Sequence, residues 1–467
     1  MYSNPIFRSS QVAARSGVVA LSLAVSATLL VLSGCQSFDP SPLDPSAHAD
    51  EWRSRVPASE EVRDFARRLE ATGSRTVSFN PANGLTLAEG ELVALVYNPD
   101  LRVARLKAGV ARATAEHAGR WDDPELSLDV LRITQGVPDP WIVGSALSLT
   151  LPVSGRLQVE KARAEAALHA ELGRVAEEEW KTMRDLRAVW LSWSADRLRL
   201  EETERIECSL DAVIETTAKL AESGELLRTE AALFRIEQEA RRADEKRLLG
   251  KVAEGEQEIR SILGLSPSAP AGLLPVIATG EMAQARGKLA EVNPTLARLR
   301  SDYAVAELAL VHKIRKQYPD IVLGPQFEED EGQSRIGMVG AIPIPILNSN
   351  KGGIAAARAE REVARAAFET EIERIEGRLA GLRARLSGIR ARRKSLESSL
   401  VPLVDRQVAD TRRLVGLGEG GSLVLLESLT RAHEAKLDVI EVRLEESETL
   451  NKIRHLLGPD KLRATTK

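Results

Sequence analysis

Residues 98–130 read NPDLRVARLKAGVARATAEHAGRWDDPELSLDV, and this stretch decides the fold. It opens with two signals for a helix start, because the Asn98 side chain can cap a first turn and Pro99 lacks only an N–H that would have no helical acceptor. Apolar residues then recur at helical spacing as far as His117, and Pro124 lies beyond the expected end of the helix. After this proline, apolar and polar residues alternate, which predicts a β-strand.

The same signals recur 195 residues later along the chain. The matching pieces are Asn98–Pro99 and Asn293–Pro294, Pro124 and Pro319, Ala162–Glu165 and Ala357–Glu360, and, with a shift of about one residue, Gly224 and Gly418, and Leu263–Gly264 and Leu457–Gly458. A period this long exceeds that of solenoid repeats, so each copy must be a substantial substructure. The sequence therefore predicts the tandem duplication of one large unit.

Each copy is predicted to contain a helix, a β-hairpin and a long antiparallel helical hairpin. Val159–Glu222 contains no proline and a single glycine, which predicts a continuous helix of about 60 residues and roughly 90 Å. Pro402 is a candidate for a kink in the second copy. The first repeat is expected at 85–265, with strands in 125–152 and helices in 159–263. A linker follows at 266–285. The second repeat is expected at 286–458, with strands in 320–346 and helices in 354–457.

The alternation along the strands puts apolar side chains on one face and polar side chains on the other. The polar set is Ser127, Asp129, Ser148, Thr150, Gln326 and Glu328. Strands of about nine to eleven residues with this pattern fit a membrane, with one face toward lipid and one toward water, and fit a soluble hairpin packed on a domain equally well. Only Trp121, Trp141, Tyr318 and Phe327 lie near the strand ends as an aromatic girdle, which counts against the membrane interpretation.

Composition excludes several classes of protein. Aromatic residues make up 4% of the 467 residues, which favours long helices packed through Leu, Ala and Val over a large globular core. Lys and Arg number 64 against 68 Asp and Glu, for a formal net charge of -4, so no basic excess predicts a nucleic-acid partner.

Residues 1–34 are expected to be an export signal, because a basic start precedes an apolar run, Gly17–Leu32, that is shorter than a membrane-spanning helix. The run ends in LSGC at residues 32–35, which resembles a bacterial lipobox, so an acylated Cys35 would begin the mature chain. The other interpretation is a cysteine that follows an ordinary cleavage site by chance. Residues 35–84 are then expected to be a lipid-anchored tether with a short helix, and 459–467 a polar tail.

No catalytic or metal-binding pattern is visible in the sequence. Its six histidines and four methionines do not approach ligand spacing, and there is no nucleophile elbow, phosphate loop or HExxH motif. Cys208 has no cysteine partner if Cys35 carries the lipid, and we expect a packed thiol. We therefore expect a protein that is not an enzyme, with no metal and no cofactor beyond the covalent lipid on Cys35.

In this arrangement of a short β-hairpin and a very long helical hairpin, duplicated behind a lipobox, the chain resembles the TolC-type outer membrane factors, and most closely the lipoprotein members related to heavy-metal and RND efflux. The resemblance extends over about residues 85–457. Its local likenesses are Asn98–Leu101 with Asp123–Leu126, the strand exits Leu149–Val153 and Ile342–Ile346, and Val415–Gly418 as a helical-tip motif.

The resemblance implies a homotrimer in the outer membrane. Four strands per chain cannot close a barrel, whereas three chains would supply twelve strands, continued by twelve long helices into the periplasm. The implied function is a passive exit duct for small molecules or metal ions, delivered by an inner-membrane RND-type pump through a periplasmic adaptor (membrane fusion protein). Gln36 favours sorting to the outer membrane, by analogy with bacterial lipoproteins.

The resemblance also places two sites at the periplasmic tips of the helices. Glu427 matches an acidic gate position, and Val424 or Leu425 stands where a second acidic residue would be. Glu230 is a weaker gate candidate in the first hairpin, and each glutamate can equally be a solvated helix charge. The residues expected to dock the adaptor are Ser223, Gly224, Glu225, Val415, Gly416, Leu417 and Gly418.

Three other features leave the cargo open. His117 and His312 are repeat equivalents, but each stands alone. Trp190 and Trp193 lie three residues apart on the long helix, where packing is favoured over ligand stacking. The acidic run at 328–331 either attracts cations or is simply solvated. A second hypothesis is a lipid-anchored periplasmic coiled-coil scaffold or adaptor without a pore, although no lipoyl or barrel-sandwich domain is visible between the helices.

Overall fold

The computed structural model describes residues 37–71, 79–134, 136, 141–277, 289–330, 333–417 and 421–459. The chain divides into two compact units, Met1–Trp52 and Arg53–Lys467, and the second unit contains the sheet and all of the long helices. Helix α2 (Pro45–Ser54) begins in the first unit. The expected signal at 1–34, Cys35 and nearly all of the tail at 459–467 lie outside the described residues.

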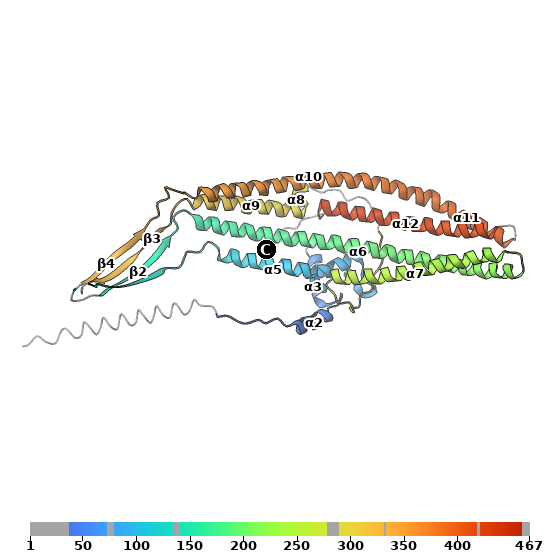
Figure 1. Ribbon diagram of the computed structural model, residues 1–467, viewed down its shortest axis with the longest axis horizontal. Coiled ribbons are helices and arrows are strands. Elements are labelled where there is room, and N and C mark those ends of the chain that lie inside the picture. The colour runs from blue at the N-terminus through green and yellow to red at the C-terminus, as the bar shows by residue number, and fades with distance from the viewer. Residues whose placement is uncertain are drawn as a thin grey trace, which may run out of the picture. The chain divides into compact units, whose positions relative to one another are not determined.

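Helices dominate the second unit, together with one small sheet (Figure 1). α3 (Glu60–Ala71) and η1 (Pro81–Asn83) precede the first copy, within the expected tether. The first copy contains α4 (Leu87–Tyr97), α5 (Pro99–His117), β1 (Glu125–Arg132), β2 (Trp141–Leu151), α6 (Arg156–Glu222) and α7 (Arg228–Ile262). The second contains α8 (Leu289–Val292), α9 (Pro294–Arg315), β3 (Ile321–Asp330), β4 (Gln333–Ala341), α10 (Lys351–Ser395), η2 (Leu396–Leu400), α11 (Val401–Gly416) and α12 (Ser422–Leu457). The prediction of a mainly helical fold with a small antiparallel β part is confirmed.

The two predicted β-hairpins form a single sheet. β1 pairs with β2 and β3 with β4, as each copy predicts, but β2 also pairs antiparallel with β3, which gives the order β1-β2-β3-β4. The last strand ends at Ala341, short of the expected limit at 346. Turn signals identify neighbours along the chain, whereas the pairing between the copies depends on contacts far apart in sequence.

The repeated Asn–Pro and Leu–Gly motifs meet in space, once in each copy. The Asn98 side chain caps the first turn of α5, and its amide donates to the last carbonyl of α7 at 2.9 Å. Asn293 caps α9 and donates to a carbonyl in the last turn of α12 at 2.8 Å. Gly264 and Gly458 follow these carbonyls, and their φ angles of 71° and 84° are positive. A Cβ at Gly264 would lie 2.1 Å from the backbone oxygen of the residue before Asn98, and a Cβ at Gly458 would lie 2.6 Å from that of the residue before Asn293. The repeat thus marks the joint that closes each copy.

Helix α6 occupies the centre of the helical part. On one side of α6 lie α5, toward the sheet, and α7, beyond it. On the other side lie α9 and α12, and α10 packs on both of them (Figure 1). The helices therefore form a layer in the order α5-α6-α9-α10 near the sheet and α7-α6-α12-α10 farther away. The largest core cluster joins α4, α6 and α7 around Val93, Trp190 and Ile259.

The long helices of the two copies differ in continuity. α6 runs for 67 residues without a break, whereas its counterpart is interrupted by the π turn η2 between α10 and α11. The expected irregularity at Pro402 is present, because this residue has no N–H for the carbonyl four positions earlier. The Val401 N–H bonds instead to the Leu396 carbonyl. Glu397, inside the π turn, accepts from Arg393 and Arg443 at 3.1 and 2.7 Å.

Candidate channel surfaces

The register of the sheet separates its two faces. Cross-strand partners share a face, so Ser127, Ala146 and Gln326 lie side by side, and the whole polar set that the sequence identified falls on this polar face. Besides Trp141 at its end, the opposite, apolar face carries ten large exposed apolar side chains. These are Leu126, Leu128, Val130, Val143, Leu147, Leu149, Leu323, Phe327, Ile336 and Met338. Among the described strands, the only large exposed apolar side chain on the polar face is Leu131.

One end of the apolar face carries an aromatic residue beside a cation. The Trp141 ring lies 5.5 Å from the Arg132 guanidinium, and the two residues are cross-strand partners at the ends of β1 and β2. Such a pair suits the boundary between hydrocarbon and water, because the ring is apolar and the cation needs hydration. The exposed apolar face is thus bounded on one side by groups of interfacial character.

The middle of the sheet contains a close approach of two backbones. A Cβ at Gly324 would lie 1.7 Å from the Leu147 carbonyl oxygen and 3.0 Å from the Ser148 Cα. The next residue is Pro325, which has no N–H to donate, and the β2–β3 register lacks partners at these two positions. β3 is a central strand, so this Gly–Pro pair marks a local interruption between the copies.

An ion-pair cluster holds the start of α6 below the sheet. Arg156 contacts Asp320 at 2.9 Å and Asp122 at 2.8 Å, and these carboxylates precede β3 and β1. The arginine side chain is half-buried, whereas Asp122 is largely exposed. One cation therefore ties the entry points of both hairpins to the central helix. No motif in the sequence predicts a role for Arg156, and only its place at the start of a long helix marks it.

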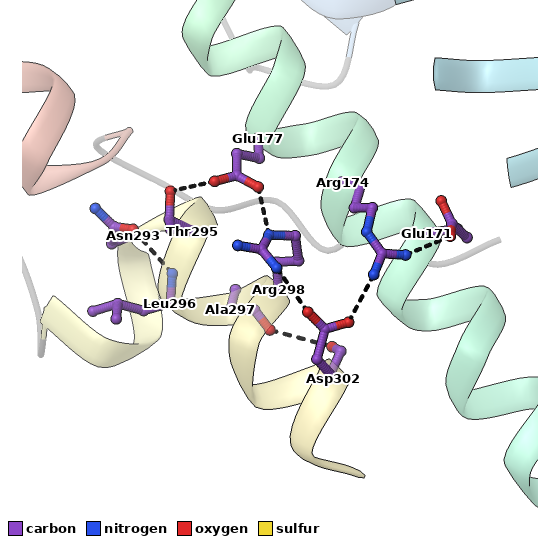
Figure 2. Close-up of polar contacts among 10 residues, drawn as sticks. Glu171, Arg174, Glu177, Asn293, Thr295, Leu296, Ala297, Arg298 and Asp302 are labelled. Atoms are coloured by element: carbon purple, nitrogen blue, oxygen red, sulfur yellow. Dashed lines mark hydrogen bonds and ion pairs between the residues drawn. The ribbon is translucent and has the colours of Figure 1, made fainter. Parts of the chain in front are cut away.

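A second polar network joins the two copies farther along α6, as Figure 2 shows. Arg298 on α9 donates to Glu177 on α6 at 2.5 Å and to Asp302 at 2.7 Å. Arg174 on α6 binds Asp302 at 3.1 Å. At Gly173 the helices approach so closely that a Cβ would lie 3.3 Å from the Arg298 Cα. The one glycine of the first long helical segment thus has a packing role at the boundary of the copies.

The turn of the first helical hairpin has a regular geometry. Gly224 has φ of 84°, and the Glu225 N–H bonds to the Leu220 carbonyl at 2.9 Å, which is the pattern of a Schellman C-cap. Ser223, Gly224 and Glu225, three of the expected docking residues, are all exposed. In the second hairpin Leu417 is exposed and Val415 is partly buried, Gly416 ends α11, and Gly418 lies outside the described residues. Docking by these residues stays a prediction.

The two gate candidates have different surroundings. Glu230, in the first turn of α7, accepts a hydrogen bond from the Ser422 hydroxyl at the start of α12, at 3.1 Å. Glu427 binds Arg431 on its own helix at 2.8 Å and is exposed. Glu230 therefore connects the two helical hairpins, and Glu427 has the local pairing expected of a surface charge. No local pattern in the sequence indicates Ser422, because this contact joins residues of different copies.

Below the tips, the two hairpins share one apolar cluster. Phe234 of α7 is fully buried against Ile206 and Leu210 of α6 and Leu425 and Leu429 of α12. Leu425, which stands near the second acidic position of the resemblance, is thus a core residue. Val424, the other residue at that position, is exposed.

The histidines that the sequence left open are not arranged for metal binding. His117 is exposed, whereas its repeat equivalent His312 is buried, and burial lowers the pKa of His312. Burial also lowers the pKa of His433 to about 4, and neither of its ring nitrogens has a hydrogen-bond partner. Arg241 and Lys436 lower this pKa further, and Asp244 opposes them. Among the described residues, no group of three His, Cys, Asp or Glu could hold a metal ion.

The remaining sequence candidates have structural explanations. Trp190 is buried, donates to the Leu274 carbonyl at 3.0 Å and contacts Trp193 edge to face, so packing accounts for this pair. In the acidic run, Glu328 and Asp330 bind Arg335.

The prediction of a packed thiol was wrong, because Cys208 is exposed. Ile206 and Leu210 fill the buried positions two residues away on either side, and a residue between them on a helix points to roughly the opposite side.

In the described part of the chain, no helix combines the length and the apolar character that crossing a membrane requires.

Comparisons with known proteins support the fold. Neither a protein-family model nor a curated protein matches the sequence. Among solved structures, the chain is similar to the outer-membrane channel OprN, with a TM-score of 0.70, 16% identity and coverage of 91% of this chain and 98% of that one. For CusC, whose structures concern folding and transmembrane channel formation, the TM-score is 0.69 at 15% identity, and the match covers 91% of this chain and 100% of that one. For the open state of the Neisseria gonorrhoeae MtrE outer membrane channel, the TM-score is 0.62 at 17% identity, and the match covers 84% of this chain and 95% of that one.

At these identities the likeness establishes the fold alone. Each likeness covers at least 84% of this chain, which includes the strands and the long helices that suggested a TolC-type factor from the sequence. The chain therefore has the fold of the TolC-type outer-membrane channels.

Proposed function

We propose that this chain is the outer-membrane exit duct of a tripartite efflux system. It would act as a homotrimer that passively conducts small molecules or metal ions delivered by an inner-membrane RND-type pump through a periplasmic adaptor. No catalytic step is part of this function, and no cofactor is needed beyond a lipid on Cys35.

The exposed apolar face of the sheet is the observation that carries the proposal. Leu128 is 70% exposed and Ile336 is 86% exposed, and in water ten such side chains on one face would be a strong aggregation hazard. In a bilayer the same face would contact hydrocarbon, and the polar face would line an aqueous lumen. The soluble-hairpin alternative needs a domain that covers the apolar face, and no described element does so.

The open edges of the sheet support the trimer. Among the described strands, β1 and β4 each have a partner on one side only, and unpaired backbone groups are very costly in lipid. Pairing β4 of one copy with β1 of the next repeats the same contact around a ring, and three copies would give a barrel of twelve strands. The helical layers would continue this ring as a tube into the periplasm.

The helical tips are the proposed periplasmic end. Exposed residues of the first turn, Ser223 to Glu225, and Leu417 of the second turn would contact the adaptor. The contact of Glu230 with Ser422 favours Glu230 over Glu427 as the residue that couples the two hairpins near a gate. A signal at 1–34 and an acylated Cys35 would deliver the chain to the outer membrane and anchor it there.

The test is to extract the full chain from outer membranes in detergent, and to measure its mass, its symmetry by negative-stain imaging and its conductance in planar bilayers. A hollow three-fold particle that conducts ions supports the duct. Solid or monomeric particles without conductance would overturn it in favour of a periplasmic coiled-coil scaffold without a pore, which none of the structural matches supports.

A further inference from the structure

His433 occupies a core position on the face of α12 that packs against α6. Toward the tips, Leu425 and Leu429 of this face form one apolar cluster with α6 and α7. Toward the sheet, Ile440 and Leu444 form another cluster with α6. His433 follows Leu429 at the spacing that separates Leu429 from Leu425, so the three residues share a face of the helix. A titratable side chain therefore lies between the two apolar clusters that join the helical hairpins.

The His433 side chain is buried without a hydrogen bond. It is 2% exposed, and neither ring nitrogen has a partner among the described residues. A neutral imidazole has one donor and one acceptor, and leaving both unsatisfied in a core is costly. A leucine at this position would pack without that cost, so packing alone does not account for a histidine here.

Two cavities border His433 on different sides. One, of about 600 Å³, lies between α6, α11 and α12, and Cys208 and Val408 are among the residues that line it. The other, of about 490 Å³, lies between α6, α7 and α12, and Thr203 and Leu248 are among its lining residues. The ring is thus buried in the contact between α6 and α12, yet a proton has a short path to it from either cavity.

In the first cavity, the carboxylates of the contact already balance cations. Glu202 of α6 binds Arg205 at 2.9 Å and Lys436 of α12 at 3.5 Å. Lys436 also binds Asp405 of α11 at 3.7 Å. The other titratable or charged groups that line this cavity are exposed, and they are Glu204, Cys208 and Arg412. A charge on His433 would therefore lie near Lys436, and no buried carboxylate that lines this cavity is free to balance it.

In the second cavity, the carboxylates have arginine partners. They are Asp196 and Glu441, which both bind Arg199, and Asp244, which binds Arg241 and Arg247. The remaining charged side chain that lines this cavity is Lys251, which is exposed. Burial above all, and then Arg241 and Lys436, lower the pKa of His433 to about 4, against the attraction of Asp244. A positive charge on this ring would thus be poorly compensated in the closed contact.

We infer that His433 is a proton-sensitive contact that holds α12 against α6 at neutral pH and releases it in acid, and that this release opens the duct at its tips. The inference rests on the proposed function and adds a means of regulating it. A neutral imidazole packs between the apolar clusters, whereas an imidazolium ring needs water or a counter-charge. Separation of α12 from α6 would hydrate the ring. The contact of Ser422 with Glu230 at the tips lies about three helical turns from His433, so it would be broken by the same movement.

Conductance of the full-length chain in planar bilayers tests the inference. We expect the open fraction of wild type to rise at least about tenfold as the pH falls from about 7.5 to about 4.5, because a hydrated His433 would bind protons with an ordinary histidine pKa. His433→Leu cannot take up the proton and should keep its neutral-pH conductance over the whole range. His433→Arg is charged at every pH and should conduct at neutral pH as wild type does in acid. If His433→Arg does not assemble, His433→Leu still decides the matter.

His455 provides a matched control on the same helix. Burial also lowers the pKa of His455 to about 4, but its ring stacks on Trp180 at the other end of α12, far from the tips. His455→Leu should therefore keep the wild-type response to acid. Hydrogen exchange gives a readout that does not depend on conduction. Corrected for the pH dependence of unfolded peptides, exchange in 200–212 and 425–440 should accelerate in acid in wild type and not in His433→Leu.

The outcomes separate this inference from the proposed function. Trimers that conduct equally at both pH values, or a full acid response in His433→Leu, would overturn the inference and leave the duct intact. Loss of the response in His455→Leu as well would also overturn it, because acid would then act through buried histidines in general. A wild-type chain that forms no trimer and conducts at no pH would overturn the duct itself.

Discussion

Gly324 shows how one residue limits the sheet. A side chain there would collide with the Leu147 carbonyl, and backbone cannot move aside as a flexible side chain can. We expect Gly324→Ala to separate β3 from β2 and to cost about 1–3 kcal/mol of stability, the usual range for overpacking. Hydrogen exchange of β2 and β3 peptides should accelerate. Gly337→Ala on β4 is the matched control, because a Cβ there meets no atom within 4 Å. Equal exchange in both variants would contradict the prediction.

His433 makes stability depend on pH. Its pKa is lowered from 6.5 to about 4 in the folded chain, so the folded state binds fewer protons than the unfolded state. Its contribution is fully present above pH 6.5 and is lost as the pH falls toward 4. We expect the thermal unfolding midpoint to fall less over this window in His433→Leu than in wild type. His117→Leu replaces an exposed histidine and should behave like wild type. If the two variants respond alike, burial of His433 is not the cause.

Among the elements, α7 and α12 meet at their first turns. The hydrogen bond from Ser422 to Glu230 joins hairpins that share no other polar contact at this level among the described residues. We expect Ser422→Ala and Glu230→Gln each to cost about 1 kcal/mol, and the double variant to cost little more, because both remove the same interaction. Thermal unfolding of the purified chain measures this coupling. Glu427→Gln, whose partner lies on its own helix, should have little effect, and fully additive losses would refute the coupling.

Local signals predicted most of the elements, and distant contacts account for what they missed. Asn98 and Asn293 cap their helices as the sequence indicates, and the long α6 follows from the absence of proline. The β2–β3 pairing and the contact of Glu230 with Ser422 join residues from different copies, so no local pattern reports them. The resemblance indicated Glu230 as a gate candidate, but it did not indicate the partner of this residue. The burial of Cys208 was predicted wrongly, because the spacing of apolar residues along a helix does not show which sides of the helix neighbouring helices cover.

At the scale of the whole molecule, the division of the sheet into two faces connects the fold with the proposed function. The polar and apolar sets are interleaved residue by residue along each strand, so neighbours in sequence serve opposite environments. A duct in a membrane needs this division, and a soluble domain would need only one of the faces to be exposed.

Neighbouring residues of β1 give the sharpest test of that division. Leu128 lies on the apolar face and Ser127 on the polar face, and both are exposed in the single chain. If the apolar face contacts lipid, Leu128→Arg should cost about 2–4 kcal/mol of membrane stability, whereas Ser127→Arg should be tolerated in a lumen filled with water. Folding into lipid vesicles, followed by protease protection of the strands, measures both variants, which introduce the same charged side chain at neighbouring positions. Equal insertion of the two would mean that the faces do not separate lipid from water, and the sheet would have to be covered by protein instead.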